Sequence, residues 1–427
     1  MNKRTIVQYL TLMSLSSFSR GAIAAIYVPF LIAGGLNLLE VNLVNLIYFS
    51  TLFICEIPTG AFADIFGRKA SFVVSCVLTS IGGIMYASSK TFWGFASSEA
   101  VLAIGATFAS GAFKAWLVDK LQHHGYTEPL HKVFSKAQIF CLIAGIISAF
   151  IGSQISDIYI QLPWMMMATS ALITGVIAFF WIEEEYFVKK KFSFKLGILA
   201  MKETAVQSIE FGIKNKVVRF LLVVGIIQVF AVQAPNMQWS PYFLEYLKDK
   251  KTLGYIWASM MLGLTAGSFL ANKFLTLIKD ERKALTMCQV LIAIGTIAIT
   301  LLPFPLGLAL FILHEIPRGM FVPLKDKFLQ DNIPSHARAT ISSFEAISPH
   351  LGGMIGLVAS GYVANRFGIS SAWVMSGLVM LTTTLLFTRK KSGRDEYSRD
   401  SKCAVNLQTT DDTATPERSG PEMDVAS

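Results

Sequence analysis

Charged residues are scarce in this chain of 427 residues. Asp, Glu, Lys and Arg together make up only 15% of the sequence, whereas a soluble globular protein carries about a quarter. Hydrophobic residues make up 53%, and the mean hydropathy is +0.54. So little charge could not cover the surface of a soluble protein of this length. The composition therefore excludes an ordinary soluble fold and indicates a chain that is surrounded mostly by lipid.

Signals of disulfides, metal sites and catalysis are also missing. The five cysteines form no Cys-x-x-Cys pair and show no disulfide-like spacing, so we interpret them as small apolar residues. The sequence contains no Walker-type phosphate loop, no zinc-ligand spacing and no catalytic triad. We therefore expect no enzymatic activity, no metal site and no cofactor, with a proton gradient as the energy source.

Long apolar stretches dominate what is present. A helix that crosses the hydrocarbon core needs about 20 mostly apolar residues, because its backbone must satisfy its own hydrogen bonds in lipid. The run after Met1–Arg4 is much longer than a signal-peptide core and lacks a small-residue cleavage site, so we expect a retained first helix. Twelve stretches qualify: Ile6 to Ala33, Val41 to Ala63, Ser71 to Ser88, Phe92 to Val118, Val133 to Gln154, Pro163 to Ile182, Val217 to Leu247, Leu253 to Ile278, Ala284 to Leu302, Leu306 to Pro323, Ala339 to Val363, and Ser371 to Phe387.

The distribution of basic residues orients these spans, because cytoplasmic loops retain lysine and arginine. With the N-terminus in the cytoplasm, three of the 37 basic residues lie within spans and five on outer loops, which leaves 29 on inner segments or at the inner ends of spans. The net charge of +9 therefore reflects membrane topology rather than a surface for nucleic acid. The outer residues are Lys90, Lys248, Lys250, Lys251 and Arg366, and the cluster at 248–251 is a local exception to the rule.

The spans divide into two groups of six around a long central loop. We predict an N-terminal six-helix bundle at 1–182, a cytoplasmic linker at 183–216, a C-terminal six-helix bundle at 217–388 and a disordered cytoplasmic tail at 389–427. In the linker, apolar residues recur at helical spacing, which predicts an amphipathic helix on the membrane surface. These residues are Ile198, Met201, Ala205, Ile209 and Ile213.

The two bundles carry weak internal similarity. A shift of 207 residues places Gly145 on Gly352, Gly60 on Gly267 and the segment 117–120 on 324–327. Matches in the same order predict two pseudo-symmetric copies of one unit, as many transporters have. Chance matches among common residues of apolar sequence are the alternative.

The loop between the second and third spans has the most specific local pattern. It reads Gly60-Ala61-Phe62-Ala63-Asp64-Ile65-Phe66-Gly67-Arg68-Lys69. Gly60 permits close helix contact, Gly67 permits a tight turn, and Arg68 and Lys69 anchor the loop in the cytoplasm. This mixture predicts a short, rigid, charged hinge.

This pattern, Gly-x-x-x-Asp-x-x-Gly-Arg-Lys, resembles the signature loop of the major facilitator superfamily. The resemblance covers the chain except for its tail and implies the major facilitator fold, in which Asp64 and Arg68 would help to hold a cytoplasmic gate. Glu56-Ile57-Pro58-Thr59 and Arg338-Ala339-Thr340 resemble bacterial drug-efflux-type members. The Gly-x-x-x-Gly-Pro-x-x-Gly-Gly pattern of drug/proton antiporters is not intact in the fifth span, which lacks the proline.

Charges inside spans indicate the transport pathway, because each costs about 2.5–3.5 kcal/mol at the bilayer centre and therefore faces a cavity or a partner. We expect a substrate or proton pathway formed by Arg20, Glu56, Glu99, Glu315 and Arg318. Arg20 is the strongest candidate, since no acid lies within one helical turn of it. Glu315 and Arg318 could instead only neutralise each other. Possible gate charges are Lys114, Asp119 and Glu345.

Together these features predict a secondary active transporter that works by alternating access and exports a drug-like or amphipathic compound in exchange for protons. Proton-coupled uptake of an organic anion or amino acid is an alternative within the same class. A sensor or scaffold that uses a transporter fold without transport is the alternative from another class. We expect a small-molecule substrate, protons and lipid as partners, no nucleic acid, a monomer, and the bacterial inner membrane as the location.

Overall fold

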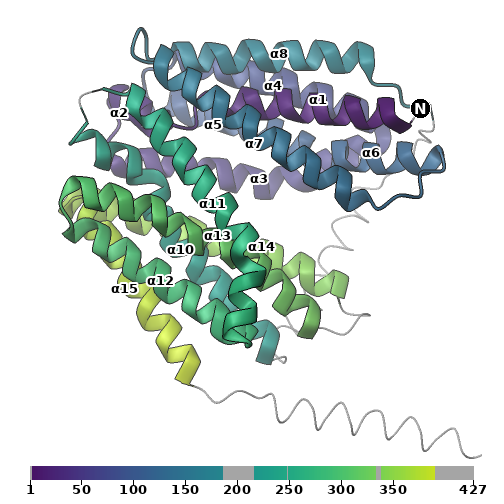
Figure 1. The fold of residues 1–427 in the computed structure, drawn as a ribbon. Coiled ribbons are helices and arrows are strands. Elements are labelled where there is room, and N and C mark those ends of the chain that lie inside the picture. The colour runs from purple at the N-terminus through teal and green to yellow at the C-terminus, as the bar shows by residue number, and fades with distance from the viewer. Residues whose placement is uncertain (1, 186–215, 248, 333–337, 390–427) are drawn as a thin grey trace, which may run out of the picture. The chain divides into compact units, whose positions relative to one another are not determined.

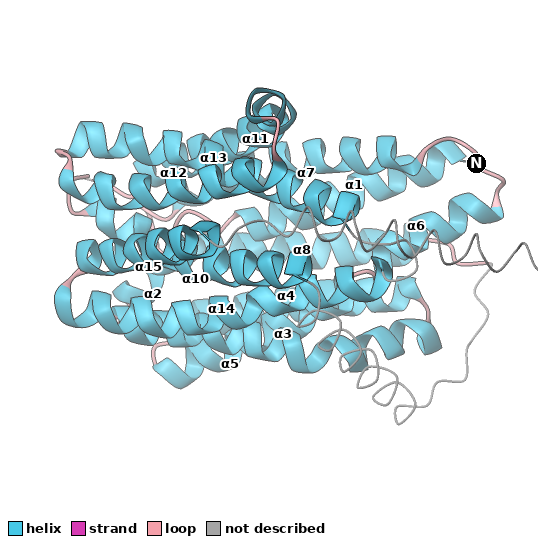
Figure 2. Ribbon diagram, turned by 90° about the horizontal axis from the view of Figure 1, so that it is seen from below, coloured by secondary structure: helices cyan, strands magenta, loops and turns pink. Residues whose placement is uncertain are grey.

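The computed structural model describes residues 2–185, 216–247, 249–332 and 338–389, and these contain fourteen helices and no strand. Residues Met1–Thr384 form one compact unit, and all contacts described below lie within it. Figure 2 shows helices joined by short loops. The prediction of an all-α membrane protein is confirmed.

Eight helices form the first half of the chain, and Figure 1 labels each of them. They are α1 (Asn2–Gly21), α2 (Tyr27–Ala33), α3 (Leu38–Phe66), α4 (Arg68–Ser88), α5 (Phe92–Ala109), α6 (Ala112–His123), α7 (Leu130–Ile155) and α8 (Leu162–Trp181). The second half contains α10 (Lys216–Leu244), α11 (Lys251–Ile278), α12 (Glu281–Leu301), α13 (Phe304–Asn332), α14 (Arg338–Phe367) and α15 (Ile369–Arg389). The predicted amphipathic helix of the linker and the predicted disordered tail lie outside the described residues.

Ten helical segments of the described chain are long and apolar enough to cross a membrane. They correspond to the predicted spans except the first and the eleventh. The eleventh predicted span is helix α14, in which the side chains of residues 338–348 are not described. The first is divided between α1 and α2.

The break in the first span has a physical cause in Pro29. Proline cannot donate a backbone hydrogen bond, and its ring collides with the carbonyl four residues earlier, here that of Ala25. Continuous helix therefore stops at Gly21, and residues 22–26 form turns before α2 begins. The fourth predicted span is also divided, between α5 and α6, where Gly111 adopts a φ of +70° that favours glycine.

The same helix pairings recur in the two halves of the chain. Helix α1 packs along α7, α3 against α5, and α4 against α5; in the second half, α10 packs along α14, α11 against α13, and α12 against α13. In the order of the predicted spans these are the same three pairs. Figure 1 shows α1 lying beside α7 and α8. This repetition is what two pseudo-symmetric copies of one unit produce.

A pair of matched glycines occupies equivalent crossings. A Cβ atom on Gly21 would lie 2.7 Å from the carbonyl oxygen of Gly145, where α1 crosses α7. Gly352 lies against the backbone of Ile226, where α14 crosses α10. Small residues allow this close approach of helices in lipid, where packing rather than the hydrophobic effect drives association. Gly145 and Gly352 therefore lie at equivalent crossings, but only Gly352 lacks room for a Cβ atom, since one on Gly145 would have its nearest neighbour at 3.5 Å.

The hydrophobic core is shared between the halves at one end only. The largest buried cluster joins α2, α3, α4, α5 and α8 to α10, α11, α13, α14 and α15. Two further clusters each belong to one half, around Phe113 and Trp116 in the first and around Leu285 and Leu324 in the second. By the predicted topology the shared cluster lies at the outer end and the separate clusters at the inner end. Within the described residues, the halves are therefore joined mainly at the outer end.

Candidate functional site: embedded charges and the inner loop

The middle of α13 holds a buried charged cluster. The side chain of Glu315 is completely buried, and its Oε1 atom accepts a hydrogen bond from Arg318 Nη1 over 2.5 Å, one turn further along the helix. Arg318 also donates through Nη2 to Oδ1 of Asn236 on α10, over 2.5 Å. A charge-assisted pair of this kind offsets part of the cost of burying both ions. The structure thus brings together two predicted pathway residues with an amide from a second helix.

His314 lies next to this pair and leaves one ring nitrogen without a hydrogen bond. The hydroxyl of Thr296 donates to the carbonyl of Ile292 over 2.8 Å, so it accepts from Nε2 of His314, 3.1 Å away. The Nδ1 atom of His314 then lies 3.7 Å from Oε1 of Glu315 and has no hydrogen-bond partner. Glu315 Oε2 is also buried without one. The cluster therefore contains two buried acceptor atoms, His314 Nδ1 and Glu315 Oε2, that have no hydrogen bond.

Glu99, the other buried acid, lies in a different environment. It is 4% exposed on α5, and its Oε2 atom accepts a hydrogen bond from the hydroxyl of Tyr86 on α4. The ring of Tyr86 stacks on Trp164, with centroids 3.9 Å apart and planes 7° apart. No described lysine, arginine or histidine contacts Glu99. The described neighbours that offset the cost of burying Glu99 are therefore aromatic rings and a hydroxyl group, not an opposite charge.

Arg20 and Glu56 lie on exposed positions of the protein surface within their spans. Arg20 donates to the hydroxyl of Ser16, over 2.9 Å, from the last turn of α1, where a cation also suits the helix dipole. It has no acidic ion-pair partner among the described residues. Glu56 likewise has no ion-pair partner there, and Gly60, one turn further along α3, faces open space.

The signature loop is held by an ion pair within the first half. Arg68 Nη2 lies 3.0 Å from Asp119 Oδ2 on α6, which joins two residues predicted separately as gate charges. Lys69 lies over the ring of Phe179, 5.2 Å from its centroid. Asp64 has no ion-pair partner in the described part of the chain.

Glu184 caps the helix that this loop begins. Its carboxylate accepts from the backbone N–H of Arg68 over 2.8 Å and from that of Lys69 over 3.2 Å. These are free N–H groups at the N-terminus of α4, where an anion is favoured. Gly67 has a φ of +99°, and a Cβ atom there would lie 2.5 Å from Glu184 Oε2. Glycine is therefore required at this position both by the turn and by the cap.

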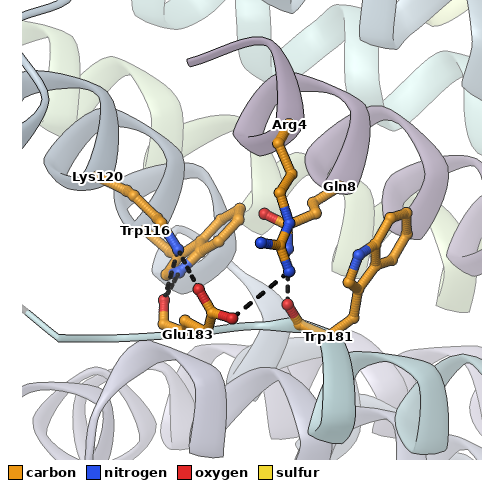
Figure 3. A network of polar contacts seen from close by, with 6 residues as sticks. All are labelled: Arg4, Gln8, Trp116, Lys120, Trp181 and Glu183. Carbon is orange, nitrogen blue, oxygen red and sulfur yellow. Dashed lines mark hydrogen bonds and ion pairs between the residues drawn. The ribbon is translucent and has the colours of Figure 1, made fainter. Parts of the chain in front are cut away.

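Glu183, the preceding residue, ties the end of α8 to two other helices (Figure 3). Its backbone carbonyl accepts from Lys120 Nζ over 3.1 Å and from Trp116 Nε1 over 3.4 Å, and its carboxylate lies 3.5 Å from Arg4. Beside it, Gln8 donates to the carbonyl of Trp181 over 2.6 Å. The first residue of the central segment, Glu183, is thus bonded to α1 and α6 shortly before the described residues are interrupted after position 185.

The remaining predicted gate charges are less informative. Lys114 is exposed on α6 and lies over the ring of Phe134, 4.7 Å from its centroid. A cation–π contact of this kind is common for a lysine at a membrane boundary. Glu345 belongs to α14, but its side chain lies outside the described part. Its role as a gate charge stays a prediction.

Polar contacts join the two halves at the predicted outer end. The amide of Asn42 on α3 donates to the carbonyl of Leu357 over 2.8 Å and to the hydroxyl of Ser360 over 3.1 Å, both on α14. On α10, the amide of Gln238 donates to the carbonyl of Ser360 over 3.1 Å. The bonds of Asn42 link the first half to α14, and the bond of Gln238 joins α14 to α10 within the second half.

A second outer contact joins α7 and α11. Lys251 Nζ lies 3.2 Å from Asp157 Oδ2, and the hydroxyl of Ser153 contacts the carbonyl of Lys251 at 3.3 Å. Just before α11, Asp249 accepts from the hydroxyl and the backbone N–H of Thr252, which lowers the pKa of Asp249. The basic cluster at 248–251, exceptional by topology, therefore includes a lysine that bridges the halves.

Several of these residues were not predicted from the sequence. Asn42 and Asn236 could have been predicted as contact residues, since an amide side chain in an apolar span usually forms a hydrogen bond to a neighbouring helix. The contacts of Glu183 and Glu184 could not have been predicted, because acids at the end of a span are common and the partners of these two are distant in sequence. The aromatic residues Trp239, Tyr242 and Trp373 pack in the shared core.

The long apolar helices, the repeated pairings and the buried charges define a polytopic membrane carrier. The chain belongs to the Major Facilitator Superfamily, whose family model matches residues 9–344 and 221–402. It is therefore a secondary transporter of the multi-pass membrane type, with a small-molecule substrate, and not a member of an enzyme family. The fold that the signature loop implied is confirmed.

Relatives and solved structures agree on this class. The chain is 22% identical over 397 residues to the uncharacterized MFS-type transporter YxaM of Bacillus subtilis, covering 88% of this chain and 93% of that protein. It is also 22% identical over 378 residues to an uncharacterized MFS-type transporter of Methanocaldococcus jannaschii, covering 85% and 91%. The nucleoside transporter NupG has a similar structure, with a TM-score of 0.74, 14% identity, and coverage of 91% of this chain and 100% of that one.

Proposed function

We propose that the protein exports a small amphipathic organic compound from the cytoplasm in exchange for protons. The observation that carries proton coupling is the burial of two carboxyl groups within the spans, Glu99 beside Tyr86 and Glu315 beside Arg318 and His314. A charge at this depth is costly and is retained where it serves an ion or substrate pathway. A carboxyl group at this depth that changes between its ionised and neutral forms binds and releases one proton, which is what proton coupling requires.

In alternating access, the two halves would rock against each other about the depth in the membrane at which these carboxyl groups lie. The outer contacts through Asn42 and through Asp157 and Lys251 would separate when the carrier opens outward. Only modest energies oppose this, since a half-exposed ion pair contributes about 0–1 kcal/mol and each neutral hydrogen bond about 0.5–1.5 kcal/mol. Contacts of this strength form and break within a transport cycle.

The direction of transport is supported by the sequence rather than by the geometry. The stretches at 56–59 and 338–340 resemble drug-efflux members, and the shared fold is used for varied substrates. Solved structures with this fold include a D-xylose-proton symporter, with a TM-score of 0.64 and 13% identity over 91% of this chain and 96% of that one. We propose the bacterial inner membrane as the location, with both termini in the cytoplasm, and a monomer.

Uptake of an organic anion by proton symport is the second candidate. Arg20 supports it, because a fixed cation with no acidic partner among the described residues could bind a carboxylate or phosphate. Export and uptake predict opposite results in membranes of opposite orientation.

A vesicle experiment tests the proposal. Inverted and right-side-out vesicles are prepared from a host without its own efflux pumps, and a panel of amphipathic dyes and organic anions is screened under an imposed pH gradient. We expect proton-driven accumulation of at least one amphipathic dye in inverted vesicles, loss of it in Glu315→Gln, and retention in Glu245→Gln, a control on an exposed loop. Proton-driven uptake only into right-side-out vesicles would overturn export, and transport unaffected by the pH gradient would overturn proton coupling.

A further inference from the structure

The first half of the chain contains a buried acid, Glu99, that lies beside aromatic side chains. Glu99 is 4% exposed and accepts a hydrogen bond from Tyr86, which belongs to a cluster of aromatic side chains from α2, α4, α5 and α8. The rings of Tyr86 and Phe95 lie 5.8 Å apart, and those of Tyr86 and Trp164 lie 3.9 Å apart. Water and lipid headgroups are therefore kept from this carboxyl group.

The charges around Glu99 differ from those around Glu315. The titratable groups that face Glu99 are tyrosines: Tyr86 on α4, Tyr27 on α2 and, at longer range, Tyr48 on α3. Burial of an ionised carboxylate without a cation costs several kcal/mol, and one hydroxyl bond offsets only about 1.5–3 kcal/mol. Glu315 avoids this cost through its ion pair with Arg318, whereas Glu99 forms no ion pair with a cation of the described residues.

A second tyrosine hydroxyl, that of Tyr27, lies close to the carboxyl group of Glu99. The hydroxyl of Tyr27 is buried and makes no hydrogen bond, although it lies close to Glu99, Tyr86 and Asn45. A neutral carboxyl group can donate through one oxygen while its other oxygen still accepts from Tyr86. The hydroxyl of Tyr27 can accept from the neutral carboxyl group or donate to the carboxylate, so a partner for Glu99 is available in both protonation states.

This acid is also placed next to the contact between the halves. Tyr27 begins α2, directly after the break in the first span. Asn45 lies one turn along α3 from Asn42, which forms the buried bonds to Leu357 and Ser360 of α14. A change in charge at Glu99 therefore acts beside two of the helices, α2 and α3, that contact the second half.

We propose that Glu99 is the carboxyl group that carries the coupling proton, and that Tyr86 and Tyr27 are its positioning residues. In this scheme one proton from the outer water binds the Glu99 carboxylate, which becomes neutral, and the same proton leaves to the cytoplasm after the halves have moved. No other bond changes. Glu315 stays ionised and paired with Arg318 throughout. This assignment rests on the proposed proton coupling and places the carrier group in the first half.

Infrared difference spectroscopy on the full chain in lipid vesicles tests the assignment without a known substrate. The spectrum at acidic pH minus that at basic pH contains the carbonyl stretch of every carboxyl group that gains a proton. We expect a band from a buried carboxylic acid that is absent in Glu99→Gln and present in Glu315→Gln and in the exposed-loop control Glu245→Gln. Tyr86→Phe should move this band to higher frequency, because the carbonyl loses a hydrogen bond, and a merely structural role for the ring would leave it in place.

Two results would overturn the assignment: a buried-acid band that persists in Glu99→Gln, or the absence of such a band from the unmodified protein. Failure of the proposed function is recognised separately. If a dye is driven by the pH gradient equally well in Glu99→Gln, only the role of Glu99 falls. If dye transport by the unmodified protein ignores the gradient, proton coupling itself falls, whatever the infrared spectra show.

Discussion

Removal of Arg318 should destabilise the protein far more than removal of an ordinary charged pair. Arg318 is 10% exposed and Glu315 is fully buried, so Arg318→Ala leaves an ionised carboxylate without a cation in a site that excludes water. Breaking a buried pair in this way costs about 3–5 kcal/mol. Glu315→Ala combined with Arg318→Ala leaves no unpaired charge, so we expect the double variant to be more stable than the sum of the two single variants by about 2–3 kcal/mol.

The measurement is the free energy of unfolding in mixed micelles, titrated with a denaturing detergent and followed by circular dichroism. Asp157 and Lys251 provide the matched control, since their side chains are 33% and 48% exposed and their N–O distance is 3.2 Å. Their coupling should not exceed about 1 kcal/mol. A coupling energy between Glu315 and Arg318 as small as that of the control would show that Glu315 is not ionised in this site. The two buried acids, Glu315 and Glu99, would then not differ in charge as proposed.

Three further changes test the loop, the outer contact and the helix crossing. Gly67→Ala should lower stability by about 1–2 kcal/mol, because alanine disfavours the positive φ and its Cβ displaces the cap formed by Glu184; equal melting temperatures for Gly67→Ala and the unmodified protein would contradict this. Asn42→Ala should weaken the outer contact by about 1–2 kcal/mol, a factor of about 5–30 in population, seen as faster reaction of Val363→Cys with a membrane-impermeant thiol reagent; an unchanged rate would argue against a gate at Asn42. Gly352→Val should prevent the close crossing of α14 and α10 and abolish folded expression in the membrane, and normal yield and monodispersity would show that the crossing tolerates a larger side chain.

Much of the fold could be predicted from the sequence, because span length and the distribution of basic residues follow from the bilayer itself. The match of Gly145 with Gly352 was informative for a physical reason, since both sit at equivalent helix crossings. The break after Gly21 could not be predicted from hydropathy, which is insensitive to hydrogen bonding. It required attention to Pro29 within the apolar run.

The candidate site was predicted only in part. Glu315 with Arg318, and Arg68 with Asp119, were identified as charges, and the first pairing follows from helical spacing. The contact between Arg68 and Asp119, and the cap formed by Glu184, depend on helices that meet across long sequence separations. The contrast between the two buried acids also needed the structure, because each is one glutamate in an apolar stretch and only the neighbours distinguish them.

The central claim is that movement of the solute is coupled to movement of protons. The most direct test uses purified protein in liposomes that contain a pH indicator, with no ATP and no imposed pH gradient. An outward gradient of a transported dye from the vesicle screen should drive protons inward and acidify the interior, and Glu99→Gln should abolish the acidification. Dye efflux at an undiminished rate with no change in internal pH would contradict proton coupling.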